Sequence, residues 1–528
     1  MTRASGGDEA ASSDHLYLGL DLGTSGLKGI ALDASGEVVA RGSASYPTSR
    51  PAAGAAEQEP GDWIAAIGQV AVQLAVDAPP RRWRAIGLSA MIPTLVTADA
   101  GGQPVGSAII WEDSRADEQA DRLREAFGAA AGAPGGEALY AVTGQWVDGR
   151  YLLPMFLRLI AAEPGRAAAT ESLLAAKDYL FGWLTGRVGT DPSTATGFGC
   201  FGLETGRWDQ GMLAACAAAA GPDRRLPALP PVLPSAATRP LRAEVAARLG
   251  CGQVPVCLGA ADSVLGALGL GVRAPGQIAY VAGTSTVILG VASKPLLDPR
   301  HRFLVTPLAE PGLWGLEMDL LATGSAMRWL AGLLRDGLDE AALIALAAGT
   351  DPAAAPVVLP YLSPGEQGAL WDPALSGTIT GLTLGHGRRH LARGLVTGIL
   401  LESRRCLAVL DEAGPFGRDL LVAGGSAAAA SFRADLADAT GRRVLAPGGP
   451  DTDFSARGAA LLAAHATGQP RPAAQAPGQP PPAAQATGQP RPAGREPAAV
   501  VSEPDPGRAE TWSALWAAHE RARKAISG

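Results

Sequence analysis

The sequence predicts an α/β protein in which two related domains face one cleft. The chain has 528 residues, which is too long for one compact core, so two domains are the natural expectation. Segments of strand and helix character alternate along most of it, an order typical of sheets covered by helices. A strand, a Gly-Thr-Ser turn and a second strand occur at residues 18–33 and again at residues 278–290. This repetition indicates two domains of similar topology.

The first of these turns, with the sequence Asp-Leu-Gly-Thr-Ser-Gly, is a candidate phosphate site. Gly23 and Gly26 can adopt a positive φ without strain and leave room for an anion near the backbone. The backbone N–H groups of such a turn, with the hydroxyls of Thr24 and Ser25, form a concave anion site. Asp21 ends the strand, where it is placed to hold a hydrated Mg²⁺ near phosphate oxygens. For this stretch alone, a tight hairpin with a solvated Asp is the alternative.

Further motifs follow in a fixed order along the chain. They are Glu-Gln-Glu-Pro at 57–60 with Trp63, Trp-Glu-Asp-Ser-Arg at 111–115, Lys-Asp-Tyr-Leu at 177–180, Leu-Gly-Ala-Ala-Asp-Ser at 258–263, Pro-Tyr-Leu-Ser at 360–363, Trp-Asp-Pro at 371–373 and Val-Ala-Gly-Gly-Ser at 422–426. With the two turns, this pattern resembles the FGGY family of carbohydrate kinases from about residue 16 to 465. The resemblance implies two actin- and hexokinase-like (ribonuclease H-like) domains that flank a nucleotide cleft.

The resemblance also implies the activity, which is the transfer of the γ-phosphate of ATP to a sugar hydroxyl with Mg²⁺. It places the catalytic carboxylate at Asp262. Phosphoryl transfer needs a group that accepts the hydroxyl proton, and a carboxylate can do so. The alternative is that Asp262 only caps the following helix, although both roles can hold together. Phosphate and ATP contacts are expected from Gly23, Thr24, Ser25, Lys28, Gly283, Thr284, Ser285, Gly424, Gly425 and Ser426, and a metal contact from Asp21.

The sugar side of the site departs from the family pattern. Candidate substrate contacts are Met91, Ile92, Trp111, Asp113, Arg115 and Asp262. Ile92 stands where xylulokinases carry a His, and Ile has no hydrogen-bonding group. The pattern as a whole is most similar to xylulokinases, which act on D-xylulose or a related pentulose. Gluconate and other polyols or sugar acids remain alternatives, as does a catalytically weak nucleotide- or sugar-binding sensor. For Asp113 and Arg115, a helix cap and a surface charge are the structural alternatives.

Composition restricts the partners. The net charge of −7 and the pI near 5.5 provide no basic surface for nucleic acid. No polybasic run indicates an anionic membrane. The first residues contain no apolar segment of a signal peptide, so a cytoplasmic enzyme is expected. A small-molecule sugar or polyol is therefore the expected partner, and a homodimer is possible.

The domain boundaries follow from composition and motif positions. Near the C-terminus, a ten-residue unit rich in Pro, Gly, Gln and Ala is repeated three times. It lacks large apolar residues, so we expect it to be disordered. The predicted parts are a disordered N-terminus (1–15), a sugar-binding domain (16–270), an ATP-binding domain (271–465), a disordered linker (466–510) and a C-terminal helix (511–528).

Overall fold

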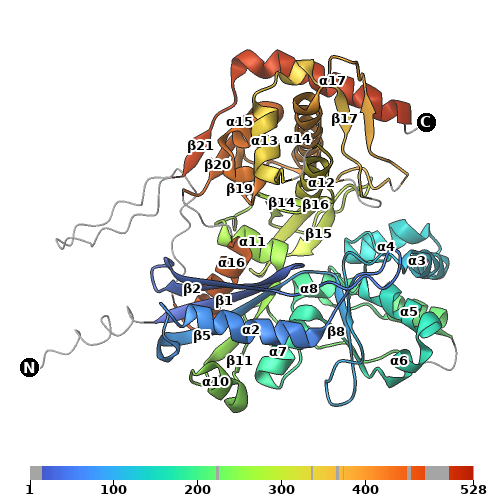
Figure 1. The fold of residues 1–528 in the computed structure, drawn as a ribbon. Coiled ribbons are helices and arrows are strands. Elements are labelled where there is room, and N and C mark those ends of the chain that lie inside the picture. The colour runs from blue at the N-terminus through green and yellow to red at the C-terminus, as the bar shows by residue number, and fades with distance from the viewer. Residues whose placement is uncertain are drawn as a thin grey trace, which may run out of the picture.

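The computed structural model describes residues 15–221, 225–334, 337–363, 368–372, 374–448, 453–469 and 499–526. Two α/β domains lie one above the other in Figure 1, so the predicted fold class is confirmed. Residues 1–14 and 470–498 lie outside the described residues. The expected disordered N-terminus and most of the expected repeat linker fall in these two segments.

The lower domain is built on a six-stranded sheet with the strand order β11-β12-β5-β1-β2-β3. Its strands are β1 (Leu16–Leu22), β2 (Gly26–Asp33), β3 (Val38–Ser45), β5 (Trp83–Ala90), β11 (Thr238–Pro240) and β12 (Pro255–Ala261). β1, β2 and β3 form an antiparallel meander, while β5 and β12 continue the sheet parallel to β1. The residues of β1 are largely apolar, as expected for a central strand that is covered on both faces.

The upper domain repeats this topology. Its main sheet has the order β15-β16-β14-β13-β19-β20-β21. The strands are β13 (Ile278–Ala282), β14 (Thr286–Ala292), β15 (Leu304–Pro307), β16 (Trp314–Leu320), β19 (Asp419–Ala423), β20 (Arg443–Ala446) and β21 (Val500–Ser502). Again a meander, β13-β14-β16, is extended by two strands parallel to its first strand. Each Gly-Thr-Ser turn therefore joins the first two strands of its own sheet.

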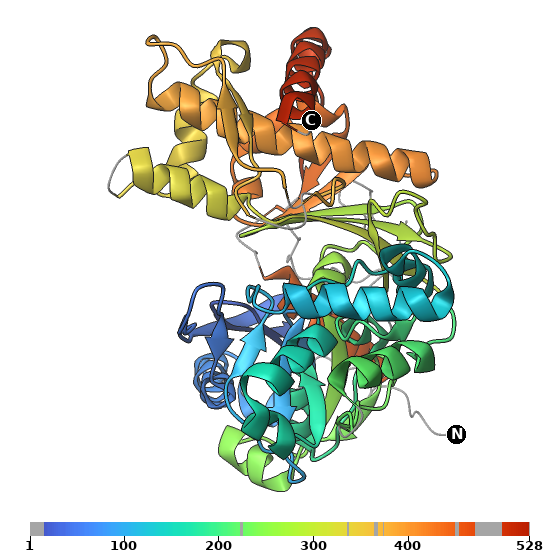
Figure 2. The same cartoon turned by 90° about the vertical axis from the view of Figure 1, so that its right-hand side faces the viewer.

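Helices cover both main sheets, and a smaller lobe extends the lower domain (Figures 1 and 2). The lobe contains a four-stranded sheet of β4 (Glu57–Gln58), β6 (Thr94–Ala98), β7 (Ala108–Ile110) and β8 (Ser172–Ala175). The helices of the lower part are α2 (Pro60–Leu74), α3 (Asp117–Ala131), α4 (Gly135–Thr143), α5 (Leu152–Ala162), α6 (Pro164–Ala169), α7 (Ala176–Thr185), α8 (Pro192–Thr196), α9 (Gln210–Ala220), α10 (Ala243–Leu249) and α11 (Asp262–Gly269). Those of the upper part and the C-terminus are α12 (Gly324–Leu334), α13 (Glu340–Ala348), α14 (Arg388–Ala413), α15 (Ala430–Thr440), α16 (Phe454–Ala466) and α17 (Ala509–Ile526).

Two short strand pairs complete the described structure. They are β9 (Phe201–Gly202) with β10 (Arg207–Trp208), and β17 (Val357–Leu359) with β18 (Thr378–Thr380).

Helices α11 and α16 lie between the two main sheets (Figure 1). In the sequence α16 lies between β20 and β21 of the upper sheet, yet it packs against β1, β5 and β12 of the lower sheet and against α11. One buried core joins Tyr17 of β1, Leu265 of α11, Leu289 of β14 and Ala460 of α16. The two sheets therefore share a hydrophobic layer in addition to the chain segment 270–277 that connects them.

Glycines allow α16 to approach its neighbours at backbone distance. A Cβ at Gly19 of β1 would lie 1.8 Å from the carbonyl oxygen of Ala456. A Cβ at Gly87 of β5 would lie 2.0 Å from the carbonyl oxygen of Ala459. On the helix itself, a Cβ at Gly458 would lie 1.9 Å from the carbonyl oxygen of Leu265 in α11. Since backbone atoms cannot move away as a flexible side chain can, these positions accept only glycine without rearrangement.

Residues 499–510 are ordered, whereas the sequence analysis predicts disorder up to residue 510. β21 pairs antiparallel with β20, and the backbone N–H of Asp505 donates to Asp438 Oδ1 at 2.7 Å. α17 begins at Ala509, two residues before the expected start, and lies against the outer end of the upper domain (Figures 1 and 2). Trp512 and His519 of α17 are buried. Strand pairing and these buried rings provide the free energy that orders residues 499–510, which composition alone does not reveal.

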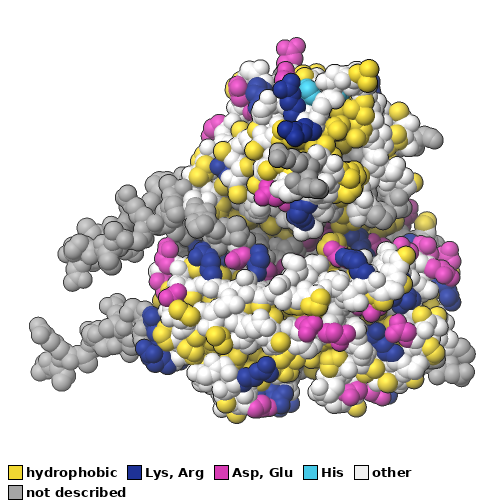
Figure 3. Space-filling view, in the orientation of Figure 1, with side chains coloured by type: hydrophobic (Ala, Val, Ile, Leu, Met, Phe, Trp, Pro, Cys, Tyr) yellow, Lys and Arg dark blue, Asp and Glu magenta, His cyan; other side chains and the backbone are white. Residues whose placement is uncertain are grey.

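In the part of the chain that the structure describes, no helix is both long and apolar enough to cross a membrane. On the face seen in Figure 3, Lys and Arg side chains are interspersed with Asp and Glu side chains and do not gather into one basic patch.

We predict that Gly458→Ala lowers the free energy of unfolding by about 1–3 kcal/mol, the usual cost of overpacking. The added methyl group would meet the backbone of α11, which must shift to accept it. Gly332→Ala is the matched control, because it is also a glycine in a helix but has no atom within 4 Å of the added Cβ. Helix propensity should make this control neutral or stabilising by up to about 1 kcal/mol. Equal effects in denaturant titrations would contradict the tight contact.

Candidate functional site

Asp262 lies where β12 ends and α11 begins, and it is the first residue of the helix. The pairing of β12 with β5 shifts register between Cys257 and Ala260. Gly259, in this irregularity, has a φ of +77°, and a Cβ there would lie 1.6 Å from the carbonyl oxygen of Leu88. The bulge therefore needs glycine, and it sets the direction in which the strand delivers Asp262 to the helix. The residue is partly exposed.

The first Gly-Thr-Ser turn adjoins Asp262. Asp21 pairs in register with Lys28 of β2 on one side and with Ser89 of β5 on the other, and the Ser89 hydroxyl donates to Asp21 Oδ1 at 2.7 Å. Ser89 is also opposite Ala260, two residues before Asp262. The Lys28 ammonium lies 2.9 Å from Asp453 Oδ1, just before α16. Neighbouring strands thus bring Asp21 and Asp262 to the same edge of the sheet.

The two carboxyl groups affect each other. Burial and then the negative charge of Asp21 raise the pKa of Asp262 to about 8. Burial also raises the pKa of Asp21, against the hydrogen bond from Ser89. A carboxylate that titrates near neutral pH is a good proton acceptor, because its affinity for the proton is much higher than that of a solvated Asp.

The second Gly-Thr-Ser turn is held from α12. The Gly283 N–H donates to the carbonyl oxygen of Ser285 at 2.8 Å, which closes the turn. Both the backbone N–H and the hydroxyl of Ser325 donate to the carbonyl oxygen of Thr284, at 3.0 and 3.1 Å. The Arg328 guanidinium donates to the Thr284 hydroxyl at 3.2 Å. A cation therefore lies beside this turn, which the sequence analysis did not identify.

The glycines at 424 and 425 lie next to the second turn. Gly424 has a φ of +100°, and a Cβ there would lie 2.1 Å from the carbonyl oxygen of Ala282, the residue before that turn. Glu340, at the start of α13, joins the two segments. Its Oε1 accepts from the Ser426 hydroxyl at 2.6 Å, and its Oε2 accepts from Arg328 at 2.9 Å. In the sequence, Glu340 has only the signature of an acidic residue in a first helical turn, so nothing marked it as part of the site.

Trp111, from the smaller lobe, contacts the first turn, and Met91, the residue after β5, contacts the end of β1 that leads into this turn. Trp111 Nε1 donates to the Thr24 hydroxyl at 2.9 Å. The Met91 N–H donates to the carbonyl oxygen of Leu22 at 2.9 Å, and its side chain is buried. Ile92, the next residue, is partly exposed and packs against the core shared by the two sheets. Of these three predicted substrate-side residues, Trp111 contacts the phosphate turn itself and Met91 contacts the strand that leads into it.

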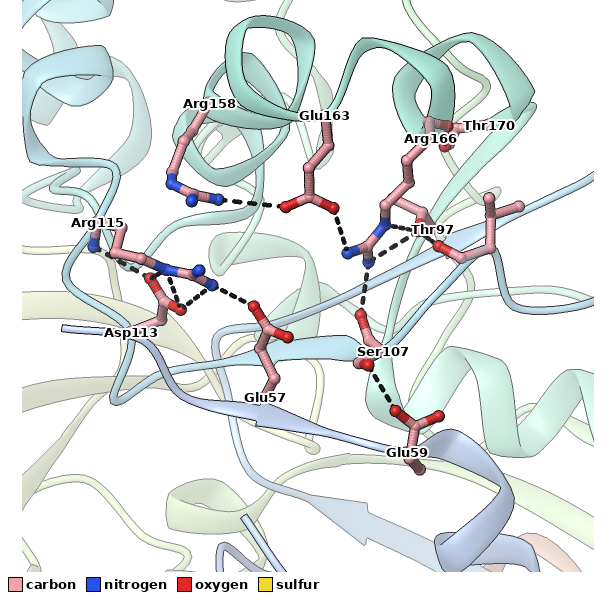
Figure 4. A network of polar contacts seen from close by, with 11 residues as sticks. Glu57, Glu59, Thr97, Ser107, Asp113, Arg115, Arg158, Glu163, Arg166 and Thr170 are labelled. Atoms are coloured by element: carbon pink, nitrogen blue, oxygen red, sulfur yellow. Dashed lines mark hydrogen bonds and ion pairs between the residues drawn. The ribbon is translucent and has the colours of Figure 1, made fainter. Parts of the chain in front are cut away.

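Asp113 and Arg115 form an internal network, shown in Figure 4. Arg115 is bound to Asp113 (Nη2–Oδ2, 2.6 Å) and to Glu57 (Nη2–Oε1, 2.5 Å). Asp113 is 2% exposed and also accepts from the Ala56 N–H at 3.0 Å. Both side chains therefore hold the β4 and β7 region together. A neighbouring chain of polar contacts in the figure includes Arg158, Glu163, Arg166, Thr97, Ser107 and Glu59.

Two further acids, Glu317 and Asp319, come from β16 of the upper sheet. Burial raises the pKa of Glu317, an effect that Ser263 and Thr306 oppose, and burial followed by the charges of Glu317 and Asp262 raises the pKa of Asp319. The signal in the sequence was the Gly-Leu-Glu-Met-Asp-Leu stretch, in which acids alternate with apolar residues of a buried strand. Such alternation places both carboxyl groups on one face.

In the described part of the chain, no cluster of three or more His, Cys, Asp or Glu could hold a metal ion by itself. Asp21 provides one carboxylate beside a turn with phosphate-binding character. Mg²⁺ in proteins is commonly bound by one or two carboxylates, substrate phosphates and waters. Asp21 fits that mode, in which the nucleotide provides the remaining oxygen ligands.

Two family models match the chain. The N-terminal domain of the FGGY family of carbohydrate kinases matches residues 16–269, and the C-terminal domain of that family matches residues 278–467.

Curated relatives and solved structures agree with these matches. A xylulose kinase of Escherichia coli is 32% identical over 450 residues, which cover 85% of this chain and 89% of the relative. A gluconokinase of Bacillus licheniformis is 27% identical over 467 residues, with 86% and 88% coverage. The crystal structure of a xylulose kinase from Rhodospirillum rubrum superposes with a TM-score of 0.80 at 29% identity, covering 97% of this chain and 99% of that one.

Proposed function

Because the chain belongs to the FGGY family of carbohydrate kinases, a family of phosphotransferases with an alcohol acceptor, we propose that it phosphorylates D-xylulose or a related pentulose, with Asp262 as general base. The observation that carries this proposal is the position of Asp262. It begins α11 beside the first Gly-Thr-Ser turn, between two sheets that each present such a turn.

Asp262 accepts the proton of the attacking sugar hydroxyl. A hydroxyl is a poor nucleophile, and a positioned base contributes typically about 10²–10⁴-fold to the rate. The raised pKa of Asp262 suits this role, and its place at a helix N-terminus keeps the developing charges near backbone N–H groups. This chemistry supports an enzyme over the sensor that the sequence left open.

The two turns bind the phosphates of ATP. In this proposal Gly23, Thr24, Ser25 and Lys28 contribute from the lower domain. Gly283, Thr284 and Ser285 contribute from the upper domain, and Gly424, Gly425 and Ser426 hold the adenosine. Asp21 holds Mg²⁺, which neutralises phosphate charge when bound. The close approach of Gly424 to the backbone of Ala282 supports this arrangement, since it leaves no side chain between the segments.

The acceptor is the least constrained part of the proposal. The similarity to a xylulose kinase favours a pentulose, and the contacts of Trp111 with Thr24 and of Met91 with Leu22 support a place for the acceptor beside the phosphate turn. Gluconate is the second candidate, because a gluconokinase is also among the relatives. The internal network of Asp113 and Arg115 supports a positioning role for this pair. We also propose a cytoplasmic location, and a homodimer remains a prediction.

Asp262→Asn tests the base. Asn has nearly the same shape but cannot take up a proton at neutral pH. We expect turnover to fall by about 10²-fold or more, with ATP affinity unchanged. The control is Asp209→Asn, which changes a helix-capping Asp of α9 outside the site and should leave turnover unchanged. Full activity of Asp262→Asn in a coupled ADP-release assay would exclude Asp262 as the base.

The pH dependence of kcat/KM offers a second test. Asp262 must be ionised to act as a base, and its pKa is raised to about 8. We therefore expect kcat/KM to fall about tenfold per pH unit well below pH 8 and to level off above it, because this parameter reports the free enzyme. A profile that is flat between pH 6 and 9 would contradict a raised pKa at the catalytic base.

Glu340→Ala tests the upper half of the nucleotide site. Loss of the carboxylate frees Ser426 and Arg328 from their common partner, so the two glycine segments should lose their relative position. We expect the dissociation constant for ATP to rise about tenfold, the effect of one lost charge-assisted hydrogen bond, with sugar affinity unchanged. Glu244→Ala is the control, because this Glu lies in the first turn of α10 far from both turns. Unchanged ATP binding in calorimetry would remove Glu340 from the site.

A further inference from the structure

β18 is a short edge strand of the upper domain, and exposed apolar side chains lie on it and directly after it. Among the described residues it pairs with β17 alone, and α14 and α17 pack on β17. β17 lies beside α17 at the margin of the upper domain (Figure 1). Ile379 of β18 is 44% exposed, and in the chain that leads on to α14, Leu382 is 54% exposed and Leu384 is fully exposed. A single copy of the chain therefore leaves three large apolar side chains of this segment in solvent.

The same segment lacks the residues that normally keep an edge strand from pairing with another chain. Residues 374–387 contain no Lys, Arg, Asp, Glu or Pro. Free edges are usually protected by charged side chains or by Pro, because their unpaired N–H and C=O groups are a template for a further strand. Exposed apolar side chains that lie together without charge indicate an interaction surface. Residues 374–387, the uncharged segment, are therefore a candidate contact surface.

The outer strands of both main sheets are protected, unlike β18. In the lower sheet, β3 contains Arg41 and β11 contains Arg239. In the upper sheet, β15 is covered by the smaller lobe, because the Val305 N–H donates to the carbonyl oxygen of Gly144 at 2.9 Å. β21, at the other edge of this sheet, is followed directly by Glu503. β18 therefore differs from all four of these strands in having neither a charge nor a covering segment at its edge.

The sequence around β18 is its own complement in antiparallel pairing. It is Gly377-Thr378-Ile379-Thr380-Gly381, which is the same in both directions. If two copies pair antiparallel about a twofold axis at the centre of this stretch, Ile379 lies opposite Ile379 of the partner subunit, and Thr378 lies opposite Thr380 of the partner subunit. Pairs of Thr and pairs of β-branched residues are favourable cross-strand neighbours. A second copy of this chain therefore matches the edge residue by residue, and no like charges face each other.

We propose that the chain forms a twofold-symmetric homodimer through β18, in which β17 and β18 of both copies join into one four-stranded antiparallel sheet. Leu382 and Leu384 flank the strand and add apolar area to the contact. Because each copy uses the same edge, the pairing is closed at two chains and does not extend into a filament. The paired strands are short, so the contact belongs to the small interfaces, and the dissociation constant is in the micromolar range. The proposal does not depend on the reaction that the protein catalyses.

Sedimentation equilibrium of the full chain between about 1 and 100 µM tests the surface. We expect the dimer fraction of the parent to rise with concentration, and Ile379→Lys to raise the dissociation constant at least about 100-fold, because two like charges would lie opposite each other. The control is Val500→Lys, which changes an equally exposed residue (43%) on the edge strand β21 and should leave the dimer intact. Leu384→Lys, at a fully exposed position, should weaken the dimer about tenfold and decides the outcome if Ile379→Lys fails to fold.

A mixing experiment tests the symmetry. Ile379→Lys and Ile379→Glu should each be monomeric alone, whereas an equimolar mixture should form a heterodimer, because residue 379 faces its own counterpart only when the axis passes through the centre of β18. A parent chain that stays monomeric up to about 100 µM would overturn the proposal. So would a dimer that persists in both Lys variants of the segment, a dimer that Val500→Lys also dissociates, or a mixture of the two Ile379 variants that remains monomeric.

Discussion

The arrangement of the cleft depends on the backbone contact between α16 and its neighbours. Gly19 and Gly87 on the lower sheet and Gly458 on the helix let main chains meet where any side chain would collide. α16 lies between two upper-sheet strands in the sequence but packs on the lower sheet, and its apolar residues belong to the core that also contains Leu289 and Leu421 of the upper sheet. α11, which starts with Asp262, packs against the same helix. The position of Asp262 relative to both turns therefore follows from this contact.

The same topology in both sheets explains why each sheet carries a similar turn between its first two strands. Each turn joins the first two strands of a meander, and each sheet continues with parallel strands from the first strand outward. The groups that hold the turns are nevertheless different. Trp111 and Ser89 support the first turn region, whereas Ser325 and Arg328 hold the second. The two sheets therefore share a backbone topology, whereas the side chains that hold the turn differ between the two domains.

Local motifs were sufficient to predict the fold class, both turns and the place of Asp262, because glycine-rich turns and strand–helix junctions are encoded by neighbouring residues. Glu340, Glu317 and the ordered strand at Val500–Ser502 were missed for a common reason. Each is held by a different segment of the chain: Ser426 for Glu340, Thr306 for Glu317, and β20 for the strand. Tertiary context of this kind leaves no pattern in a single stretch of chain.

The carboxylates around Asp262 oppose the stability of the fold, because burial and mutual repulsion penalise their ionised forms. A chain optimised for stability alone would not bury Asp262 beside the charge of Asp21. The shared core between the sheets, with Leu265 and Ala460, opposes that repulsion by burying apolar surface.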